Sequence, residues 1–507
     1  MELRNRISSV ALVAVLSTIV AFALARSPLL LLGATSMGLL ISSLLLIPNG
    51  GQKLFLTSLG SLLTGYAFFG KGFAYLPAAP IFFGEIVLFI GLVAVLSSGI
   101  ILPILQLRFL LLITAFGVWG VLCTVPFVSR YGLFALRDAV VWGYALFALL
   151  VAGFLLKSDG ISAVVRAYGR WVPWCLFSMA VVFGLQTLAF DWLPVVSSGD
   201  SKITFPYLKG GDIAVHLAGA GCFIVLRLHR DAAKGPKHGR EWIWWVFWFA
   251  ALIAPVTGRG GLLAILAAFL LLLVLKPTAQ WGKPALAGVV LATALAFTGA
   301  EIDVGSPRKI SINQIAQNAR SLLGASGDSR LEGTRAWRLA WWRKIVDYTL
   351  FGEHFWTGKG FGVNLADDDG FQGSLGHSLR SPHNGHLTIL ARMGVPGLAL
   401  WLLLQGGFAF GLLRAHFRAK RARREWWARV NLWILAYWTA FMVNGMFDVF
   451  LEGPQGGIWF WCLFGFGIAA LEIQKRERRA WAIEQRGASL SYLESPFRSQ
   501  PLSATRW

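Results

Sequence analysis

The chain has 507 residues, of which 56% are hydrophobic and only 14% carry a charge. Soluble domains carry roughly 25% charged residues, so this composition excludes an ordinary soluble protein and indicates one polytopic membrane domain. The net charge of +21 is compatible with nucleic-acid binding. No arginine-aromatic groove or nucleic-acid motif accompanies it, however, and we expect no nucleic-acid partner.

The apolar runs predict an all-α polytopic membrane protein with about 14 transmembrane helices. A spanning helix needs about 20 mostly apolar residues, and these runs are continuous rather than alternating, which favours helices over a barrel. The first run resembles a signal peptide, but a second apolar run follows it at once, so we interpret it as a retained helix. The predicted runs are 8–25, 28–47, 54–70, 81–98, 109–126, 135–156, 171–190, 212–227, 242–257, 261–275, 284–299, 397–413, 430–450 and 456–472.

The basic residues predict the orientation, because cytoplasmic loops carry an excess of Lys and Arg. With both termini inside, the inner segments hold 28 Lys/Arg and 9 Asp/Glu, against 18 and 16 outside. The inner segments richest in Lys and Arg are "RLHRDAAKGPKHGRE", "RAHFRAKRARREWWAR" and "EIQKRERRAWAIEQR". The net charge is therefore interpreted as a topology signal.

This topology divides the chain into four parts: spans 1–11 in residues 1–299, a large outer loop in 300–396, spans 12–14 in 397–472, and an inner tail in 473–507. The tail is rich in Ser, Gln and Arg from about residue 485, and we expect it to be disordered. A shorter outer loop, 191–211, has little periodicity. A loop as long as 300–396 in a compact fold is usually functional or disordered.

Within the large loop, residues 328–348 predict a helix at the membrane interface. The segment carries three tryptophans and the arginines Arg335, Arg338 and Arg343, a composition typical of an interfacial amphipathic helix. Asp328 or Ser329 is available as its N-cap. The apolar residues that recur at near-helical spacing are Leu331, Ala336, Leu339, Ile345 and Tyr348.

Three motifs in this loop resemble phosphate-binding or metal-binding sites. "GEHFWTGKG" fails the P-loop pattern, because five residues separate its glycines and Gly360 replaces the Ser or Thr. "LADDDGFQGSLG" fails the EF-hand pattern, and its aspartates favour a solvated acidic turn. His383 and His386 are spaced as a metal pair, but the nearby third ligands are only His377 and Asp369. Both histidines equally suit a polar membrane interface, and we predict no metal and no cofactor.

Charged residues at the outer ends of spans are the other candidates. Arg259 precedes two glycines at the start of the tenth span, where a guanidinium and a helix N-terminus together favour an anion. Snorkelling to the headgroups is the alternative. Arg137 and Asp138 are adjacent opposite charges that we expect to offset each other, and Asp448 is a lone carboxylate.

These residue types fit a lipid-linked diphosphate. Arginine forks bind phosphates bidentately, and histidine near neutral pH suits proton abstraction from a hydroxyl. The set includes Arg259, Arg335, Arg338 and His383. Because ATP is absent outside, an activated lipid carrier is the expected energy source.

The motif His383-Asn384, nine residues, Gly394-Val-Pro-Gly397 resembles that of the O-antigen ligase/polymerase superfamily of bacterial inner-membrane glycan transferases. Arg259 and Leu263 are similar to its Arg-x3-Leu, and Arg335 to its loop arginine; the resemblance is strong from about 250 to 413. It departs from the family in having fourteen spans, where ligases typically have about twelve. Pro396 should break the helix after the motif, leaving 386–393 as a short interfacial helix with His383 at its mouth.

The resemblance implies a metal-independent, inverting glycosyltransferase of the GT-C-like type at the periplasmic face. It would move a glycan from undecaprenyl diphosphate, with His383 activating the acceptor hydroxyl and with Arg259 and Arg335, beside Arg338, on the diphosphate. Secondary members would be Asn384, His386, Asp448 and Arg137. The expected partners are the undecaprenyl-diphosphate-linked glycan, lipid A–core or a growing glycan as acceptor, and membrane lipids.

Several acceptors and one other class of function stay open. An O-antigen ligase acting on lipid A–core is favoured, because no outer-loop arginine matches the Arg-x10-Gly of some polymerases. An O-antigen or exopolysaccharide polymerase is the alternative, and a protein hydroxyl is a third acceptor. A transporter of lipid-linked glycans would place polar residues at mid-membrane, whereas the ionisable residues here cluster at the outer rim.

Overall fold

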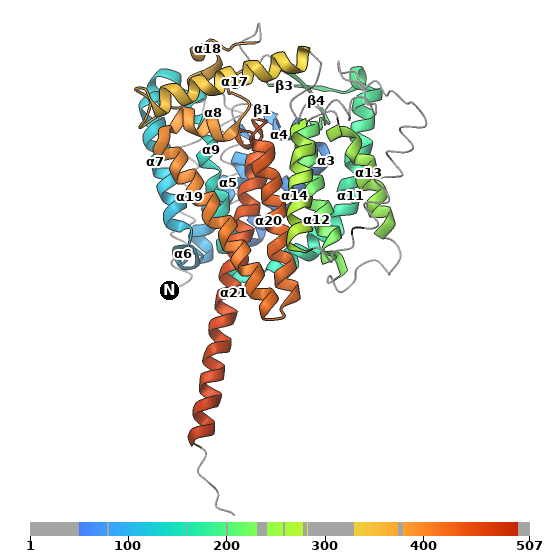
Figure 1. Cartoon of the computed structure of the whole chain (residues 1–507), viewed down its shortest axis with the longest axis vertical. Coiled ribbons are helices and arrows are strands. Elements are labelled where there is room, and N and C mark those ends of the chain that lie inside the picture. Colours follow the sequence, from blue (N-terminus) through green and yellow to red (C-terminus); the bar gives the residue numbers. More distant parts are fainter. Residues whose placement is uncertain are drawn as a thin grey trace, which may run out of the picture.

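A computed structural model describes residues 50–78, 81–158, 160–198, 201–230, 241–256, 259–276, 281, 329–373 and 379–494. These residues form a bundle of apolar helices with short elements and loops gathered at one end (Figure 1). The helical membrane fold predicted from the sequence is thus confirmed in kind. Two small hairpins supply the strands seen in the described part of the chain.

The first half of the chain alternates long helices with short ones. Leu76 and Phe83 close the first hairpin through a backbone hydrogen bond of 2.9 Å. The second hairpin lies within residues 191–211, where the sequence predicted no element. The elements are α3 (Gly50–Phe69), α4 (Lys71–Ala74), β1 (Pro77–Ala78), β2 (Ile81–Phe82), α5 (Phe83–Ser98), α6 (Ile101–Leu105), α7 (Leu110–Tyr131), α8 (Leu133–Asp138), α9 (Val140–Gly143), α10 (Ala145–Ser158), α11 (Ile161–Leu188), η1 (Phe190–Trp192), β3 (Val195–Ser198) and β4 (Ser201–Thr204).

The second half contains the longest helices. They are α12 (Gly210–Val225), η2 (Leu228–Arg230), α13 (Glu241–Val256), α14 (Arg259–Leu275), α17 (Ser329–Leu350), α18 (Leu365–Asp369), α19 (Gly385–Arg421), α20 (Glu425–Gly445), η3 (Phe450–Glu452) and α21 (Pro454–Glu494).

Within the described residues, five helical stretches are long and apolar enough to cross a membrane by length and composition, and four shorter apolar helices accompany them. Three of the fourteen predicted runs, 8–25, 28–47 and 284–299, lie outside the described residues. Each of the other eleven overlaps a helix. The run 135–156 is divided among α8, α9 and α10, and its spanning part is Val140–Ser158. The spanning stretches are Leu110–Tyr131, Val140–Ser158, Ile161–Leu188, Gly385–Arg421 and Pro454–Ala480.

The membrane part of α21 occupies the centre of the bundle and packs on α10, α19 and α20. Aromatic rings fill this core: Phe408 of α19 stacks on Phe464 of α21 with centroids 4.0 Å apart, and Trp461 is 2% exposed. Beyond the bundle α21 continues as a helix to Glu494 (Figure 1). Residues 473–494 are therefore helical, where the sequence suggested a disordered tail from about 485; their Glu, Arg and Ala are strong helix formers.

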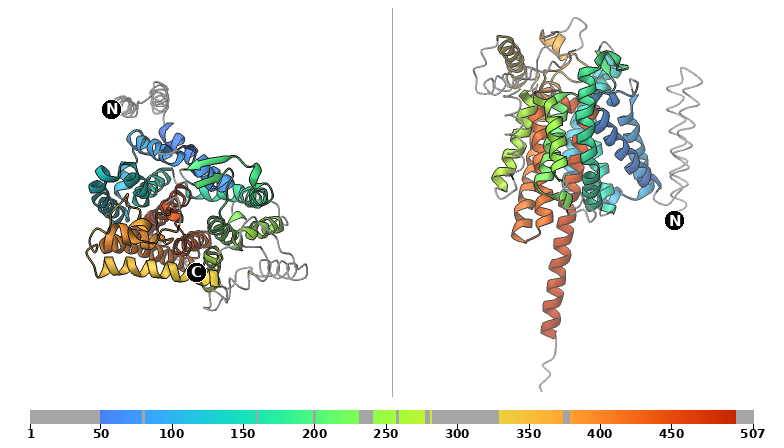
Figure 2. Two further views of the ribbon diagram at one scale, coloured as in Figure 1. Left: turned by 90° about the horizontal axis from the view of Figure 1, so that it is seen from above. Right: turned by 90° about the vertical axis from the view of Figure 1, so that its right-hand side faces the viewer.

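Helix α17 lies across the end of the bundle and runs along one edge when viewed from above (Figures 1 and 2). The helix predicted at 328–348 is confirmed, but its buried face differs from the prediction. Trp341 and Ile345 are fully buried, whereas Leu339 is 49% exposed and Ala336 is exposed. Trp341 stacks on Phe371 and donates a hydrogen bond to Asp369 Oδ2 at 2.6 Å. Contacts with Phe371 and Asp369 in the following loop therefore determine that the face of α17 carrying Trp341 is the buried one.

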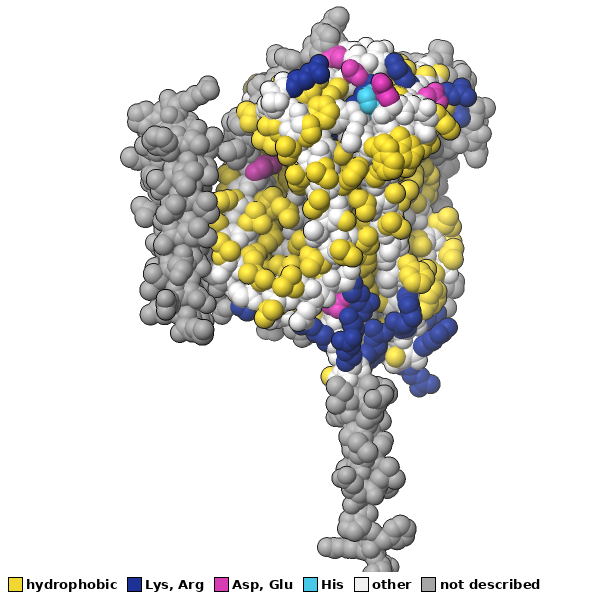
Figure 3. Space-filling model, turned by 90° about the vertical axis from the view of Figure 1, so that its left-hand side faces the viewer, with side chains coloured by type: hydrophobic (Ala, Val, Ile, Leu, Met, Phe, Trp, Pro, Cys, Tyr) yellow, Lys and Arg dark blue, Asp and Glu magenta, His cyan; other side chains and the backbone are white. Residues whose placement is uncertain are grey.

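The two ends of the bundle differ in charge. Lys and Arg side chains gather at the end from which α21 emerges, while the opposite end mixes both signs (Figure 3). At the basic end Arg108 pairs with Glu472 at 2.7 Å, and Arg424 pairs with Glu477 at 3.1 Å. The end that carries α17 is the one that holds the candidate site.

Candidate functional site

His383 occupies a constrained position immediately before α19. Its backbone φ is 53°, a left-handed value that is uncommon for a residue other than glycine. On one side Pro382 O accepts a hydrogen bond from Trp342 Nε1 of α17 at 2.8 Å. On the other, Asn384 caps α19, with Oδ1 accepting from the backbone N–H groups of His386 and Leu387 at 3.1 Å each. The half-buried imidazole is thus positioned from both sides.

The two glycines of the motif shape the helix that His383 precedes. Gly394 has φ 65° and ψ −169°, which interrupts α19 after one short segment, 385–393. A Cβ there would lie 2.4 Å from the carbonyl oxygens of Phe355 and Trp356. The short helix expected at 386–393 is found, but the break lies at Gly394 and not at Pro396, which sits two residues later. At Gly397 a Cβ would lie 2.2 Å from Met393 Cβ.

Hydrogen bonds from neighbouring segments satisfy the carbonyls that the break exposes. Ala391 O accepts from Lys359 N at 2.7 Å, and Met393 O accepts from Trp119 Nε1 at 2.9 Å. Val395 N donates to Phe355 O at 2.8 Å. The end of the short helix is therefore fixed by the loop after α17 and by α7.

An ion pair from two other elements stands beside this loop. The ammonium of Lys209, the residue before α12, lies 2.5 Å from Asp448, which follows α20. Burial raises the pKa of Asp448, but the charge and hydrogen bond of Lys209, together with the Val449 N–H and His383, lower it by more in sum, so the carboxyl pKa is below its ordinary value. Burial lowers the pKa of Lys209, but Asp448, Asp212 and Tyr207 together raise it by more, so the ammonium pKa is above its ordinary value. Both groups are therefore charged at neutral pH.

His383 lies in the field of this pair and of two further cations. Burial and the Arg338 guanidinium lower the pKa of His383 to about 4; Asp448 opposes them, while Lys209 and Lys71 add to them. The imidazole is therefore neutral at pH 7 and able to accept a proton.

Among the loop arginines whose side chains the structure describes, Arg338 is the one that reaches this cluster. Its Nη1 donates to Phe447 O at 3.3 Å, one residue before Asp448, and its side chain is half-buried. Arg335 lies one turn earlier on α17 and is exposed.

Two helices begin at the same turn. Arg259 is the first residue of α14, and its side chain is outside the described part of the structure. A Cβ on Gly260 would lie 2.8 Å from Phe447 Cβ, and one on Gly261 would lie 3.4 Å from Gly211 Cα of α12. The N-termini of α12 and α14 therefore approach each other beside the Phe447–Asp448 turn. Helix N-termini favour anions.

The other two polar residues of the motif, His386 and Asn384, have structural roles. His386 Nδ1 accepts from Trp401 Nε1 at 3.1 Å, so Nε2 carries the proton and donates to Met442 O at 3.0 Å. This fixed neutral tautomer is unsuited to a metal pair. Asn384 acts as the helix cap described above.

Arg137 is exposed on α8, and the expectation that it offsets Asp138 is wrong. The Asp138 carboxylate instead lies 3.0 Å from each of Arg380 and Arg392, and it also accepts from Gly362 N at 3.2 Å. Adjacent residues on a helix point in different directions. These longer-range partners therefore take the carboxylate and tie the segment before His383 to α8.

The acidic turn 367–369 is engaged by lysines. Asp368 and Asp369 pair with Lys359 at 2.5 Å each, and the Asp369 backbone carbonyl accepts from Lys344 Nζ at 2.7 Å. Among the described residues no group of three or more His, Cys, Asp or Glu side chains is placed to hold a metal ion. His377, the other predicted third ligand, is outside them.

Lys209 and Lys71 were not predicted as site residues. A sequence signal for Lys209 exists, because Lys209-Gly210-Gly211 opens α12 as Arg259-Gly260-Gly261 opens α14. Lys71 follows α3, and only folding brings it near His383.

Comparison with known proteins gives one family. Residues 245–402 match the family model described as O-antigen ligase, a segment that includes Arg259, Arg338 and His383 but not Lys209 or Asp448. No curated protein matches the chain significantly. The family indicates glycosyl transfer of the O-antigen ligase/polymerase type, in a chain whose helices suit a multi-pass membrane protein. The resemblance of this segment to the O-antigen ligase/polymerase superfamily is thus confirmed for residues 245–402.

Proposed function

We propose that the protein transfers a glycan from undecaprenyl diphosphate to an acceptor hydroxyl, and that it is an O-antigen ligase acting on lipid A–core. The observation that carries the proposal is the neutral His383 imidazole, which stands among Arg338, Lys209 and Asp448 beside two helix N-termini. This arrangement supplies a base and an anion site within one small volume.

In this proposal the cations hold the donor diphosphate. Arg338 and the start of α14 at Arg259 bind the phosphate oxygens, and Lys209 contributes a point charge from α12. The same charges stabilise the lipid diphosphate as it leaves, because its negative charge grows in the transition state. Arg335 stays at the exposed rim and has a smaller share.

His383 acts as the general base. The acceptor oxygen attacks the anomeric carbon, the bond from that carbon to the diphosphate oxygen breaks, and the hydroxyl proton passes to the imidazole. In-line attack inverts the anomeric configuration. A pKa near 4 makes a weak base, but the bound diphosphate offsets the cations that lower the pKa, so donor binding strengthens the base. Asp448 then stabilises the imidazolium.

The charge asymmetry supports a periplasmic site. Cytoplasmic ends of membrane proteins carry the Lys/Arg excess, and the basic end of this bundle is opposite to the site (Figure 3). We therefore propose that residues 300–396 form a periplasmic catalytic loop in the bacterial inner membrane. No step in this scheme needs a metal, so transfer should survive EDTA treatment.

The test is transfer by the purified, reconstituted protein from glycan-loaded undecaprenyl diphosphate, with and without lipid A–core. Product that requires lipid A–core supports the ligase. A ladder of longer glycans formed without it would identify a polymerase instead, and unchanged donor under both conditions would contradict glycosyl transfer.

A further inference from the structure

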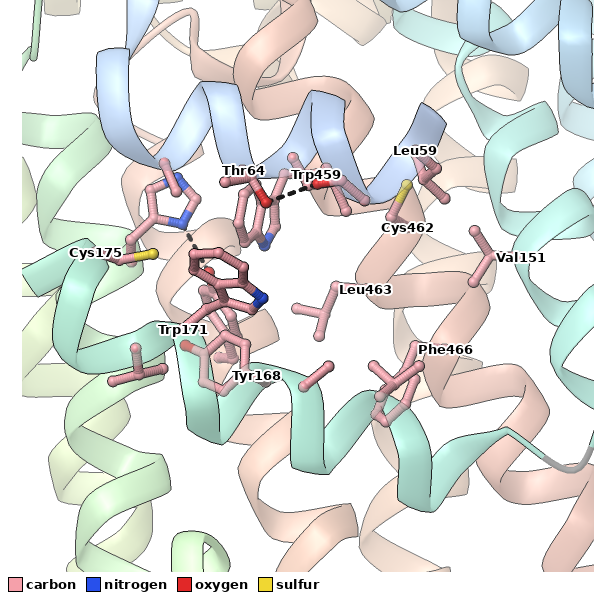
Figure 4. A pocket seen from close by; sticks show the side chains of 18 of the residues that line it. Leu59, Thr64, Val151, Tyr168, Trp171, Cys175, Trp459, Cys462, Leu463 and Phe466 are labelled. Atoms are coloured by element: carbon pink, nitrogen blue, oxygen red, sulfur yellow. Dashed lines mark hydrogen bonds between the residues drawn. The ribbon is translucent and has the colours of Figure 1, made fainter. Parts of the chain in front are cut away.

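A large cavity lies between α3 and α11, below the candidate site (Figure 4). Its volume is about 620 Å³, within the range of roughly 300–1,000 Å³ of small-molecule sites. Its walls are almost entirely apolar and come also from α10, α12, α20 and α21. The outer wall includes the exposed Gly60, Ala163 and Ala167, so the cavity opens sideways between α3 and α11.

The inner wall includes a buried histidine. His216 of α12 lines the cavity; its Nδ1 is 2.7 Å from Tyr437 Oη, and its buried Nε2 has no hydrogen-bond partner. Lys209 lies seven residues earlier in the chain, as the extended N-cap residue of the same helix. Helix α12 therefore leads from the cavity wall directly to the candidate site.

A second lysine follows the end of another wall helix, α3. Ala67 of α3 lines the cavity, α3 ends at Phe69, and Lys71 follows. A hydrogen bond of 2.7 Å from Lys71 N to Tyr207 O fixes this turn. The ammonium groups of Lys71 and Lys209 both interact with His383 and with the buried Asp212. Two cations thus stand where the apolar cavity approaches the site.

We propose that this cavity binds the apolar chain of the lipid-linked donor, with its diphosphate at Lys71 and Lys209. The inference rests on the proposed function. A cationic end above an apolar slot suits an amphiphile with an anionic head. A slot between two helices suits one chain, as in a polyprenyl diphosphate, better than the several acyl chains of lipid A.

The decisive variant is Gly60→Leu, because a Cβ at Gly60 meets nothing within 4 Å and its side chain would enter the cavity. Gly184→Leu is the matched control, since Gly184 is on α11, is equally open, and does not line the cavity. Transfer is measured with two donors that carry the same glycan, one on undecaprenyl diphosphate and one on a chain of two isoprene units.

Lipid tails are as apolar as the cavity, so the effect of Gly60→Leu comes from excluding the chain. One methylene group more or less in an apolar pocket changes kcat/KM by roughly 10–200-fold. We expect KM for the undecaprenyl donor to rise by about tenfold, with little change for the short donor. Lys71→Gln should raise KM for both donors, because it acts on the head. Equal behaviour of Gly60→Leu and Gly184→Leu would overturn the proposal.

A binding experiment separates this inference from the proposed function. A photoreactive undecaprenyl diphosphate without glycan should label α3 and α11 in the wild type, and label them less in Gly60→Leu. Labelling of α3 and α11 without any glycan transfer would support lipid-chain binding in the cavity and would contradict the proposed glycosyl transfer. Labelling that phospholipid displaces but undecaprenyl diphosphate does not would overturn the proposal. So would a Gly60→Leu protein that loses thermal stability without changing donor preference.

Discussion

The carboxylate of Asp448 and the ammonium of Lys209 lie 2.5 Å apart, although the two residues are 239 positions apart in the chain. Lys209 therefore stays charged beside His383, and the negative charge of Asp448 partly compensates the positive charge that Lys209 places near the imidazole.

Asp448→Asn should leave Lys209 uncompensated and remove the charge that supports the imidazolium. We expect the pKa of His383 to fall below about 4 and transfer to fall by roughly 10²-fold, as for a lost electrostatic partner. Histidine NMR titration and kcat measure the two effects. Asp448→Glu keeps the charge and should restore much of the activity; an unchanged pKa in the Asn variant would contradict the assignment.

His383→Asn tests the base. Asparagine tolerates the left-handed φ of 53° better than alanine does, so the variant should fold and insert while transfer falls by at least about 10²-fold. Size-exclusion chromatography and thermal unfolding check the fold. Activity retained by a well-folded variant would remove His383 as the base.

The arginines of α17 form a matched pair. Arg338 is half-buried and bonds to Phe447 O, whereas Arg335 is exposed. We expect Arg338→Ala to raise KM for the donor by about tenfold or more, the value of one charge-assisted hydrogen bond, and Arg335→Ala to change it less than threefold. A larger effect at Arg335 would reverse the assignment. Arg259→Lys, which loses the bidentate fork, should also transfer poorly.

The pKa of His383 predicts a stability change in acid. Its value is lowered from 6.5 to about 4 in the folded protein, so between these pH values the unfolded chain binds a proton that the folded chain does not. Acidification through this window therefore destabilises the folded protein, and the contribution levels off below pH 4. The thermal midpoint of the wild type should fall more steeply from pH 6.5 to 4 than that of His383→Asn. Parallel curves would contradict the shift.

Gly394→Ala should destabilise the domain by about 2–5 kcal/mol, from the positive φ and from contact with two carbonyls. Gly406→Ala on the same helix is the control, since a Cβ there meets nothing within 4 Å. Thermal unfolding in detergent compares them, and similar midpoints would show that the break at Gly394 is dispensable.

The sequence predicted what local patterns determine. The apolar runs located the helices, the α17 segment was placed within two residues, and the short helix after His383 was expected from Pro396. The exact break required Gly394, because loop carbonyls from residues far from it approach its backbone. The tryptophan face of α17 likewise depends on Phe371 and Asp369, which no helical periodicity reveals.

The sequence predicted the residues of the candidate site that belong to motifs, but not the residues from other elements that surround them. His383, Arg259 and Arg338 carry recognisable patterns, whereas Lys71 and Lys209 become site residues only when folding brings the end of α3 and the start of α12 near His383. Arg137 was paired with its neighbour Asp138 because sequence shows adjacency, whereas the fold gives that carboxylate Arg380 and Arg392.

The interruption at Gly394 also separates two mechanical tasks. The segment 385–393 is held by Lys359 and Trp119, while the rest of α19 packs in the membrane bundle. We expect tilting of the membrane part, as bilayer thickness varies, to be absorbed at this one backbone joint. The histidine would then keep its alignment while the span below it adjusts, and the reaction geometry would be insulated from the elasticity of the membrane.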